Sequence, residues 1–245
     1  SFDDYARFVH AFAARYGRYI TAYQVWDEPN IAPHWGARPA DPAGYVQLLQ
    51  LAAEAIRSAD PDAVIIAGGL APNLEPGGMN KSDVAYLSEM YRLGAAGSFD
   101  VLGAKAYGFW SGPEDRRVSP EVLNYSRLIL LRREMVRHGD AHKSIWALES
   151  GWCALPEGWA GRPSPHGSDE AFIQAERLTR AIRRTRQEWP WLGLQCVLHL
   201  QPRAANDDPI WGYALIGPDG EPRPGFAILH EAIDYESILY PGLTH

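Results

Sequence analysis

The sequence predicts a parallel α/β domain, and three observations lead to this fold class. Segments with helical periodicity alternate with short apolar segments along the whole chain. The apolar segments are nearly continuous in hydrophobic residues, as expected for strands that are covered on both faces. The chain has 245 residues, of which 46% are hydrophobic, so it can bury a substantial single core. Strands separated by long helices form a parallel sheet through right-handed crossovers.

Five apolar segments are predicted as strands, because each is short and is bounded by polar or turn-forming residues. They are residues 20–26, 63–69, 100–107, 144–149 and 193–200.

Helices are predicted before and between the first three strands. The first has an apolar stripe at helical spacing from Tyr5 to Tyr16. The second begins at Asp41-Pro42, because aspartate caps a first turn and proline fits the first helical position. The third carries Leu87 on its buried face.

Three more helices are predicted in the second half of the chain. One begins at Ser119-Pro120 and runs to about His138. The next begins near Ser168, where two acidic residues form the first turn, and it ends before the Trp-Pro pair at 189 and 190. The last has Phe226 on its apolar face. The chain shows no linker, so it is predicted to be one domain over residues 1–245.

Composition excludes several classes of partner. The formal net charge is −7 and the sequence has no basic run, which argues against nucleic acid as a partner. Apolar runs stay well short of the roughly 20 residues of a membrane-spanning helix. No secretory signal is visible, which leaves the compartment open. Cys153 and Cys196 are predicted to be free thiols, since two cysteines do not make a disulfide framework.

Two glutamates close predicted strands. Glu28 lies in Trp-Asp-Glu-Pro-Asn and Glu149 in Ile-Trp-Ala-Leu-Glu-Ser-Gly-Trp. In parallel α/β proteins the loops after the carboxyl ends of strands build the active site. The chain also has nine tryptophans and twelve tyrosines, and flat aromatic rings are common platforms for sugars. This pattern favours hydrolysis of a glycosidic bond by a pair of carboxyl groups.

Four motifs carry a resemblance to a known group of enzymes. They are Tyr-Gln-Val-Trp-Asp-Glu-Pro-Asn, Ile-Ala-Gly-Gly-Leu-Ala-Pro-Asn, Asp-Val-Leu-Gly-Ala-Lys-Ala-Tyr-Gly-Phe and Ile-Trp-Ala-Leu-Glu-Ser-Gly-Trp. Together they resemble strands four to seven of the clan A glycoside hydrolases, closest to families 39 and 5. The resemblance implies a (β/α)8 TIM barrel in which residues 193–200 form strand eight.

In this register the chain supplies strands four to eight of the barrel. The resemblance therefore implies that a missing amino-terminal segment provides the first three βα units. The alternative is a short, open α/β sheet of five strands that keeps the motifs. Five strands alone would leave two exposed edges.

The resemblance also assigns roles to the glutamates. It makes Glu28 the general acid/base and Glu149 the nucleophile of a retaining β-glycosidase that acts on oligo- or polysaccharides. Glu28 must then keep its proton, which burial among Trp26, Pro29 and Trp35 would favour. Glu149 must be ionised.

Two residues depart from the clan pattern. The residue before the acid/base is usually asparagine, but here it is Asp27, whose charge would raise the pKa of Glu28. We expect Asp27 to contact the substrate. On strand six, His-x-Tyr is replaced by Lys105 and Tyr107, which share one strand face. An inward Lys105 would pair with Glu149, and Tyr107 would hydrogen-bond the nucleophile.

Other candidates for sugar contact lie at or beyond the carboxyl ends of the strands, and Trp152 is the strongest of them. They are Asn30, His34, Trp35, Asn73, Trp110, Trp152, His199, Gln201 and Trp211. We expect no cofactor and no metal, because neither a paired-histidine spacing nor a phosphate-binding loop occurs. Two other classes remain open: a noncatalytic carbohydrate-binding barrel, and a metal-dependent hydrolase that uses His34, His166 and His199.

Overall fold

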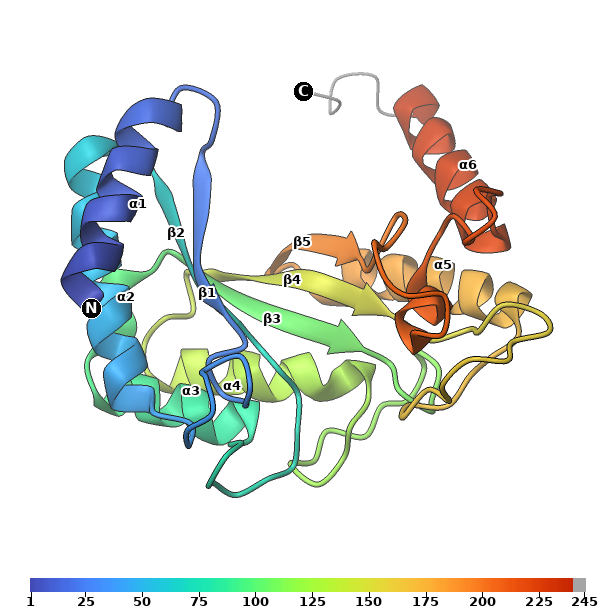
Figure 1. The fold of residues 1–245 in the computed structure, drawn as a ribbon, viewed down its shortest axis with the longest axis horizontal. Coiled ribbons are helices and arrows are strands. Elements are labelled where there is room, and N and C mark those ends of the chain that lie inside the picture. Colours follow the sequence, from blue (N-terminus) through green and yellow to red (C-terminus); the bar gives the residue numbers. More distant parts are fainter. Residues whose placement is uncertain (240–245) are drawn as a thin grey trace.

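Five parallel strands form one sheet, and helices follow them in regular alternation (Figure 1). The computed structural model describes residues 1–239, with side chains described to residue 231. The strands are β1 (Ala22–Asp27), β2 (Val64–Leu70), β3 (Val101–Tyr107), β4 (Ser144–Gly151) and β5 (Leu192–Val197). The α-helices are α1 (Phe2–Tyr16), α2 (Pro42–Ala59), α3 (Asp83–Arg92), α4 (Leu128–Arg137), α5 (Ala171–Glu188) and α6 (Pro224–Leu239).

The strand order in the sheet is the order in the chain. β1 pairs with β2, β2 with β3, β3 with β4 and β4 with β5, and every pair is parallel. The register places Asp27 opposite Gly69 and Lys105 opposite Glu149. All five strands therefore end at one edge, where their loops meet. The predicted parallel α/β architecture is confirmed.

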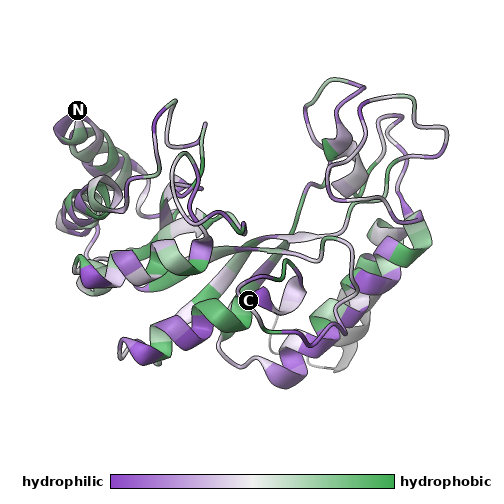
Figure 2. Ribbon diagram, turned by 90° about the horizontal axis from the view of Figure 1, so that it is seen from below, coloured by the Kyte–Doolittle hydropathy of each residue, from purple (hydrophilic) through white to green (hydrophobic). Residues whose placement is uncertain are grey.

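The hydrophobic core lies between the sheet and the helices. The helices show apolar residues on some faces and polar residues on others (Figure 2). The core is built from large buried side chains of helices and strands, among them Tyr45, Leu49, Ile65, Leu87, Met90 and Leu102. β2 and β3 are buried along nearly their whole length, whereas β1 and β5 are partly exposed. The difference arises because β1 and β5 each have a strand neighbour on one side only.

One predicted helix begins later than the sequence suggests. The expected start was Ser119-Pro120, but residues 125–127 form a 3-10 turn and α4 begins at Leu128. The Arg127 side chain donates to the carbonyls of Pro120 at 2.9 Å and Val122 at 3.1 Å. Because these carbonyls are held by a guanidinium, the segment folds as a loop instead of a helical turn.

Several local predictions hold. Asp41 caps α2 by accepting the Gly44 amide at 2.9 Å. Cys153 and Cys196 are free thiols. Among the helices of residues 1–239, none is long and apolar enough to cross a bilayer.

Candidate active site

The first glutamate follows β1 on a backbone conformation that side chains rarely adopt. Trp26 has a φ angle of 68° and Glu28 one of 47°, both in the left-handed region. Such residues store strain of about 1–3 kcal/mol each. The Glu28 amide donates to the Gly69 carbonyl at 3.1 Å, which ties this turn to β2. As a result Asp27 and Glu28 approach the same lysine, although adjacent residues of a regular strand point to opposite faces.

Lys105 is the cation at the centre of the site. Its Nζ lies 2.6 Å from Glu149 Oε1, 3.0 Å from Asp27 Oδ1 and 3.8 Å from Glu28 Oε1. The side chain is only 2% exposed, so its ammonium meets carboxylates and little water. The prediction that Lys105 points inward and pairs with Glu149 is confirmed. Two carboxylate oxygens lie within hydrogen-bond distance of its ammonium, and its contact with substrate stays a prediction.

Glu149 lies at the carboxyl end of β4 and is 29% exposed. Its Oε1 accepts from the Lys105 ammonium, and its Oε2 accepts from the Tyr107 hydroxyl. The predicted hydrogen bond from Tyr107 is therefore confirmed. Contacts from one charged donor and one neutral donor are of the kind that stabilise a carboxylate anion.

Glu28 has a different environment and is only 13% exposed. Burial raises the pKa of Glu28 above its ordinary value, and the charges of Lys105 and His34 oppose this rise in part. The charges of Asp27 and Glu149 add to it, so the effect expected of Asp27 is confirmed. Glu28 is therefore protonated more readily than an exposed glutamate.

The groups around the glutamates keep fixed protonation states. Burial alone would lower the pKa of Lys105, but the hydrogen bond and charge of Glu149, followed by those of Asp27, raise it. Burial, followed by the charge of Glu149, raises the pKa of Tyr107. Lys105 therefore stays charged and Tyr107 stays a neutral donor near neutral pH.

His34 faces Glu28 from the loop after β1. Its Nε2 lies 3.1 Å from Glu28 Oε2, and its Nδ1 lies 4.0 Å from Asp27 Oδ2. These three side chains offer ligand atoms within 4.8 Å of one another. The Lys105 ammonium already occupies the cation position beside both carboxylates, so a metal ion there would meet a second positive charge. We therefore assign no metal to this cluster.

A glycine in the neighbouring strand β2 makes room for the lysine. A Cβ atom at Gly69 would lie 3.0 Å from Lys105 Cε and 3.2 Å from Asp27 Oδ1. The absence of a side chain at this position lets the ammonium reach Asp27 across β2.

A cavity of about 360 Å³ opens beside Glu28. Glu28 and Tyr107 line it, together with residues from the loops that follow all five strands. The remaining wall includes Phe109, His166 and Tyr213, and aromatic walls with a few polar groups are typical of sugar sites. Two larger hollows share no lining residue with it.

The structure divides the other predicted contact residues into two groups. Asn30, Trp35, Trp152 and Trp211 are at most 6% exposed, and their contact with substrate stays a prediction. Three of them hold loops: the Trp152 indole donates to a carbonyl at 2.7 Å, the Trp211 indole to another at 3.0 Å, and the Asn30 amide to two more. The second group is available to a ligand, because Trp110 is 60% exposed and His199 is half-buried.

Two residues at the site escaped the sequence prediction. Gln24 donates to Asp27 Oδ1 at 2.9 Å, which the strand pattern could not show because Trp26 breaks the regular alternation. The Tyr213 ring lies 5.9 Å from that of Tyr107 and lines the cavity. Its signal was the Trp-Gly-Tyr sequence in the last loop.

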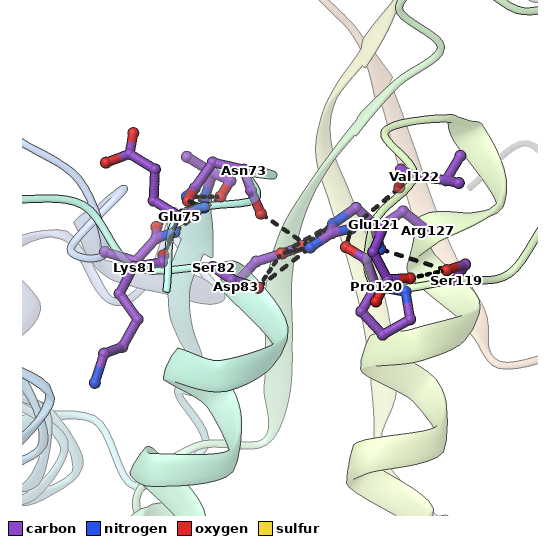
Figure 3. Close-up of polar contacts among 12 residues, drawn as sticks. Asn73, Glu75, Lys81, Ser82, Asp83, Ser119, Pro120, Glu121, Val122 and Arg127 are labelled. Carbon is purple, nitrogen blue, oxygen red and sulfur yellow. Dashed lines mark hydrogen bonds and ion pairs between the residues drawn. The ribbon is translucent and has the colours of Figure 1, made fainter. Parts of the chain in front are cut away.

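A buried ion pair holds two of the active-site loops together (Figure 3). Arg127 and Asp83 face each other across α3 and α4, with Nη2 2.6 Å from Oδ1. Arg127 also donates to the Asn73 carbonyl at 3.0 Å. The loop after β2 and the loop after β3 are thus fastened to one guanidinium.

Similar proteins were found by structure and not by sequence. No family model and no curated protein matches the sequence. A family 39 glycoside hydrolase from Bacteroides cellulosilyticus is similar in structure, with a TM-score of 0.65 and 17% identity, over 91% of this chain and 43% of that one. The fold of the described residues is that of part of a (β/α)8 barrel.

Two further clan A structures agree with this fold. A family 39 β-xylosidase from Caulobacter crescentus has a TM-score of 0.60 and 17% identity, over 95% of this chain and 48% of that one. A family 10 protein from Paenibacillus barcinonensis has a TM-score of 0.56 and 16% identity, over 95% of this chain and 67% of that one. The chain spans less than half the length of both family 39 proteins.

Proposed function

We propose that the protein is a retaining β-glycosidase in which Glu28 is the general acid/base and Glu149 the nucleophile. The observation that carries this proposal is the contrast between the two carboxyl groups. Burial and neighbouring carboxylates raise the pKa of Glu28, whereas Glu149 accepts hydrogen bonds from an ammonium and a phenol. Pairs of carboxyl groups with opposed environments are the basis of acid and nucleophile assignments.

The reaction would proceed in two displacements. Glu28 donates its proton to the glycosidic oxygen while a Glu149 oxygen bonds to the anomeric carbon and the leaving group departs. A water then gives its proton to Glu28, and its oxygen bonds to the anomeric carbon as the bond to Glu149 breaks. Each group ends in its starting state.

Lys105 holds the two carboxyl groups close to each other. Its Nζ lies 2.6 Å from a Glu149 oxygen and 3.8 Å from a Glu28 oxygen. A retaining mechanism requires a close pair of this kind, with the carboxyl groups about 5–5.5 Å apart.

The substrate class in this proposal is a carbohydrate, an oligo- or polysaccharide with a β-linkage. The cavity beside Glu28, with its aromatic wall, supports it. The similar structures include a β-xylosidase, which is consistent with such a substrate.

We further propose that residues 1–245 belong to one catalytic domain that is completed by three more βα units. β1 and β5 each have a free edge, and unpaired edges invite pairing with another strand. Three parallel strands between these edges would close a barrel of eight. Reconstitution with a segment of that kind would be detected as a gain in thermal stability.

The proposal is tested with a panel of activated aryl β-glycosides. We expect release of the aryl group, a first product with the β-configuration in early proton NMR spectra, and loss of release in Glu149→Ala. A product of inverted configuration would overturn the retaining assignment. Saturable sugar binding without turnover would instead favour the noncatalytic carbohydrate-binding barrel.

A further inference from the structure

The proposed site contains more negative groups than one cation can neutralise. Three carboxyl groups, from Asp27, Glu28 and Glu149, lie within 3.8 Å of the single Lys105 ammonium. Asp27 is the unexplained member, because the proposed reaction assigns it no step. An extra carboxylate beside a nucleophile and an acid would be harmful unless its charge were used.

The contacts of Asp27 indicate how its charge is used. Its Oδ1 accepts from the Lys105 ammonium at 3.0 Å and from the Gln24 amide at 2.9 Å, so two donors orient one oxygen. The ammonium thus has carboxylates on two sides, Asp27 from β1 and Glu149 from β4, and Glu28 lies further away at 3.8 Å. Asp27 is 44% exposed, so water also contacts its carboxylate.

We propose that Asp27 and Lys105 form one ion-paired positioning unit: Asp27 fixes the ammonium between the two glutamates, and Lys105 makes the charge of Asp27 tolerable beside Glu28. This inference rests on the roles proposed above for Glu28 and Glu149. Asp27 and Lys105 both depart from the clan pattern, and the inference explains them as a single change in which each residue compensates the charge of the other. Lys105 contacts the proposed nucleophile directly, and Asp27 acts through Lys105.

The groups that face Glu28 determine the sign of each effect. Asp27 and His34 face it from its own loop, Lys105 and Tyr107 from β3, and Glu149 from β4. Two more titratable groups lie near the unit, Tyr45 of α2 and Cys196 of β5. Burial raises the pKa of both, so neither adds charge near neutral pH.

Single substitutions should move the titration of Glu28 in opposite directions. Asp27→Asn removes a like charge, so the alkaline limb of the pH profile of kcat/KM should shift to lower pH. Lys105→Gln removes an opposite charge and should shift that limb to higher pH. Each shift should be about one pH unit, as is typical of a charge at this range. The double variant should return close to the wild-type limb.

A second measurement does not depend on catalysis. In the wild-type protein Asp27→Asn deprives Lys105 of a partner and should lower the Tm. In the Lys105→Gln protein the same change relieves repulsion between carboxylates and should raise the Tm. Such a reversal of sign is a coupling between the two residues. The carboxyl titration of Glu28 itself can be followed by carbon-13 NMR, with Glu28→Gln to assign its resonance.

The control is a second buried lysine–aspartate pair in the same protein. Lys143 Nζ lies 2.8 Å from Asp140 Oδ2, directly before β4 begins. It is separated from Glu149 by most of that strand, about 20 Å at the usual rise per residue. Lys143→Gln should lower the Tm without moving the titration of Glu28.

The outcomes separate this inference from the proposed function. Opposite shifts in the NMR titration with no turnover would remove the enzyme proposal and leave the positioning unit standing. Turnover with an unmoved Glu28 titration in both single variants, or with shifts in the same direction, would overturn the positioning unit. A lower Tm caused by Asp27→Asn in both the wild-type and the Lys105→Gln protein would also overturn it.

Discussion

The Arg127 cluster and the Lys105 cluster both bring opposite charges together, and they are built differently. In the Arg127 cluster a single carboxylate, Asp83, meets a single guanidinium, and carbonyl oxygens take the remaining donors. Arg127 and Asp83 are 3% and 2% exposed. In the Lys105 cluster three carboxyl groups share one ammonium, and a cavity opens beside them.

This difference separates a structural ion pair from a site suited to chemistry. In the Arg127 cluster the donors of the guanidinium are satisfied within the protein. In the Lys105 cluster burial raises the pKa of Glu28, the charges of Asp27 and Glu149 add to this rise, and Glu28 lines a cavity, so its proton is available to a ligand. Burial is common to both clusters, so the surplus of carboxyl groups and the open cavity distinguish them.

The largest expected effect is on turnover, and it comes from substituting Glu149 in the Lys105 cluster. Glu149→Gln should reduce turnover of activated aryl β-glycosides to background, because an amide cannot act as the nucleophile. The amide keeps one oxygen, which can accept from Lys105, and its NH2 group then faces the Tyr107 oxygen. Because the buried Lys105 loses its closest anion, the Tm should fall below that of the wild type. Residual turnover that is unaffected by the substitution would show that Glu149 is not the nucleophile.

A somewhat smaller effect on turnover is expected from substituting Glu28. Glu28→Gln should slow cleavage of poorly activated glycosides by about 10²–10⁴-fold, the usual contribution of general acid catalysis. Aryl groups that leave readily need little protonation, so their release should be slowed much less. The comparison requires steady-state rates for a series of leaving groups. Equal losses across the series would contradict the role of Glu28 as an acid.

A substitution in the Arg127 cluster should lower the free energy of unfolding. Arg127→Met leaves the Asp83 carboxylate buried without its cation, which costs about 3–5 kcal/mol in similar cases. Urea unfolding gives the free energy directly. The pH dependence of turnover in the remaining folded protein should match that of the wild type. A changed pH dependence would mean that the two clusters are not independent.

The smallest expected effect is on the pH dependence of stability, and it comes from Glu28. Because its pKa is raised in the folded protein, Glu28 adds stability below the ordinary glutamate value of about 4.3, and this is lost as pH rises through the raised pKa. Above that pH the anion is destabilising. Glu28→Gln should therefore be more stable than the wild type at pH 8, with the difference disappearing towards pH 4. Thermal unfolding across this range measures it, and an opposite trend would contradict the assigned burial.

Periodicity in the sequence was enough to place the strands and the charged centre. Residues two apart share a strand face, so the inward direction of Tyr107 predicted that of Lys105, and the carboxyl end of the next strand supplied Glu149. The late start of α4 was not predicted, because a Ser-Pro pair precedes loops as well as helices. The guanidinium that decides between them comes from a side chain further along.

The fate of the aromatic residues could not be predicted from residue type. Trp152 and Trp110 both follow strands, yet the first is buried under a loop and the second is exposed. The approach of His34 to Glu28 depends on left-handed backbone at Trp26 and Glu28, which no residue type there signals. Side chains after a strand are placed by loop packing, which involves residues distant in sequence.

The empty space at Gly69 has an evolutionary consequence. Even an alanine methyl group would come within 3.0 Å of Lys105 Cε and 3.2 Å of Asp27 Oδ1. A methyl group at position 69 would therefore force both side chains to shift by a few tenths of an ångström. Among descendants of one ancestor, we expect glycine at position 69 to be inherited together with lysine at position 105 and aspartate at position 27.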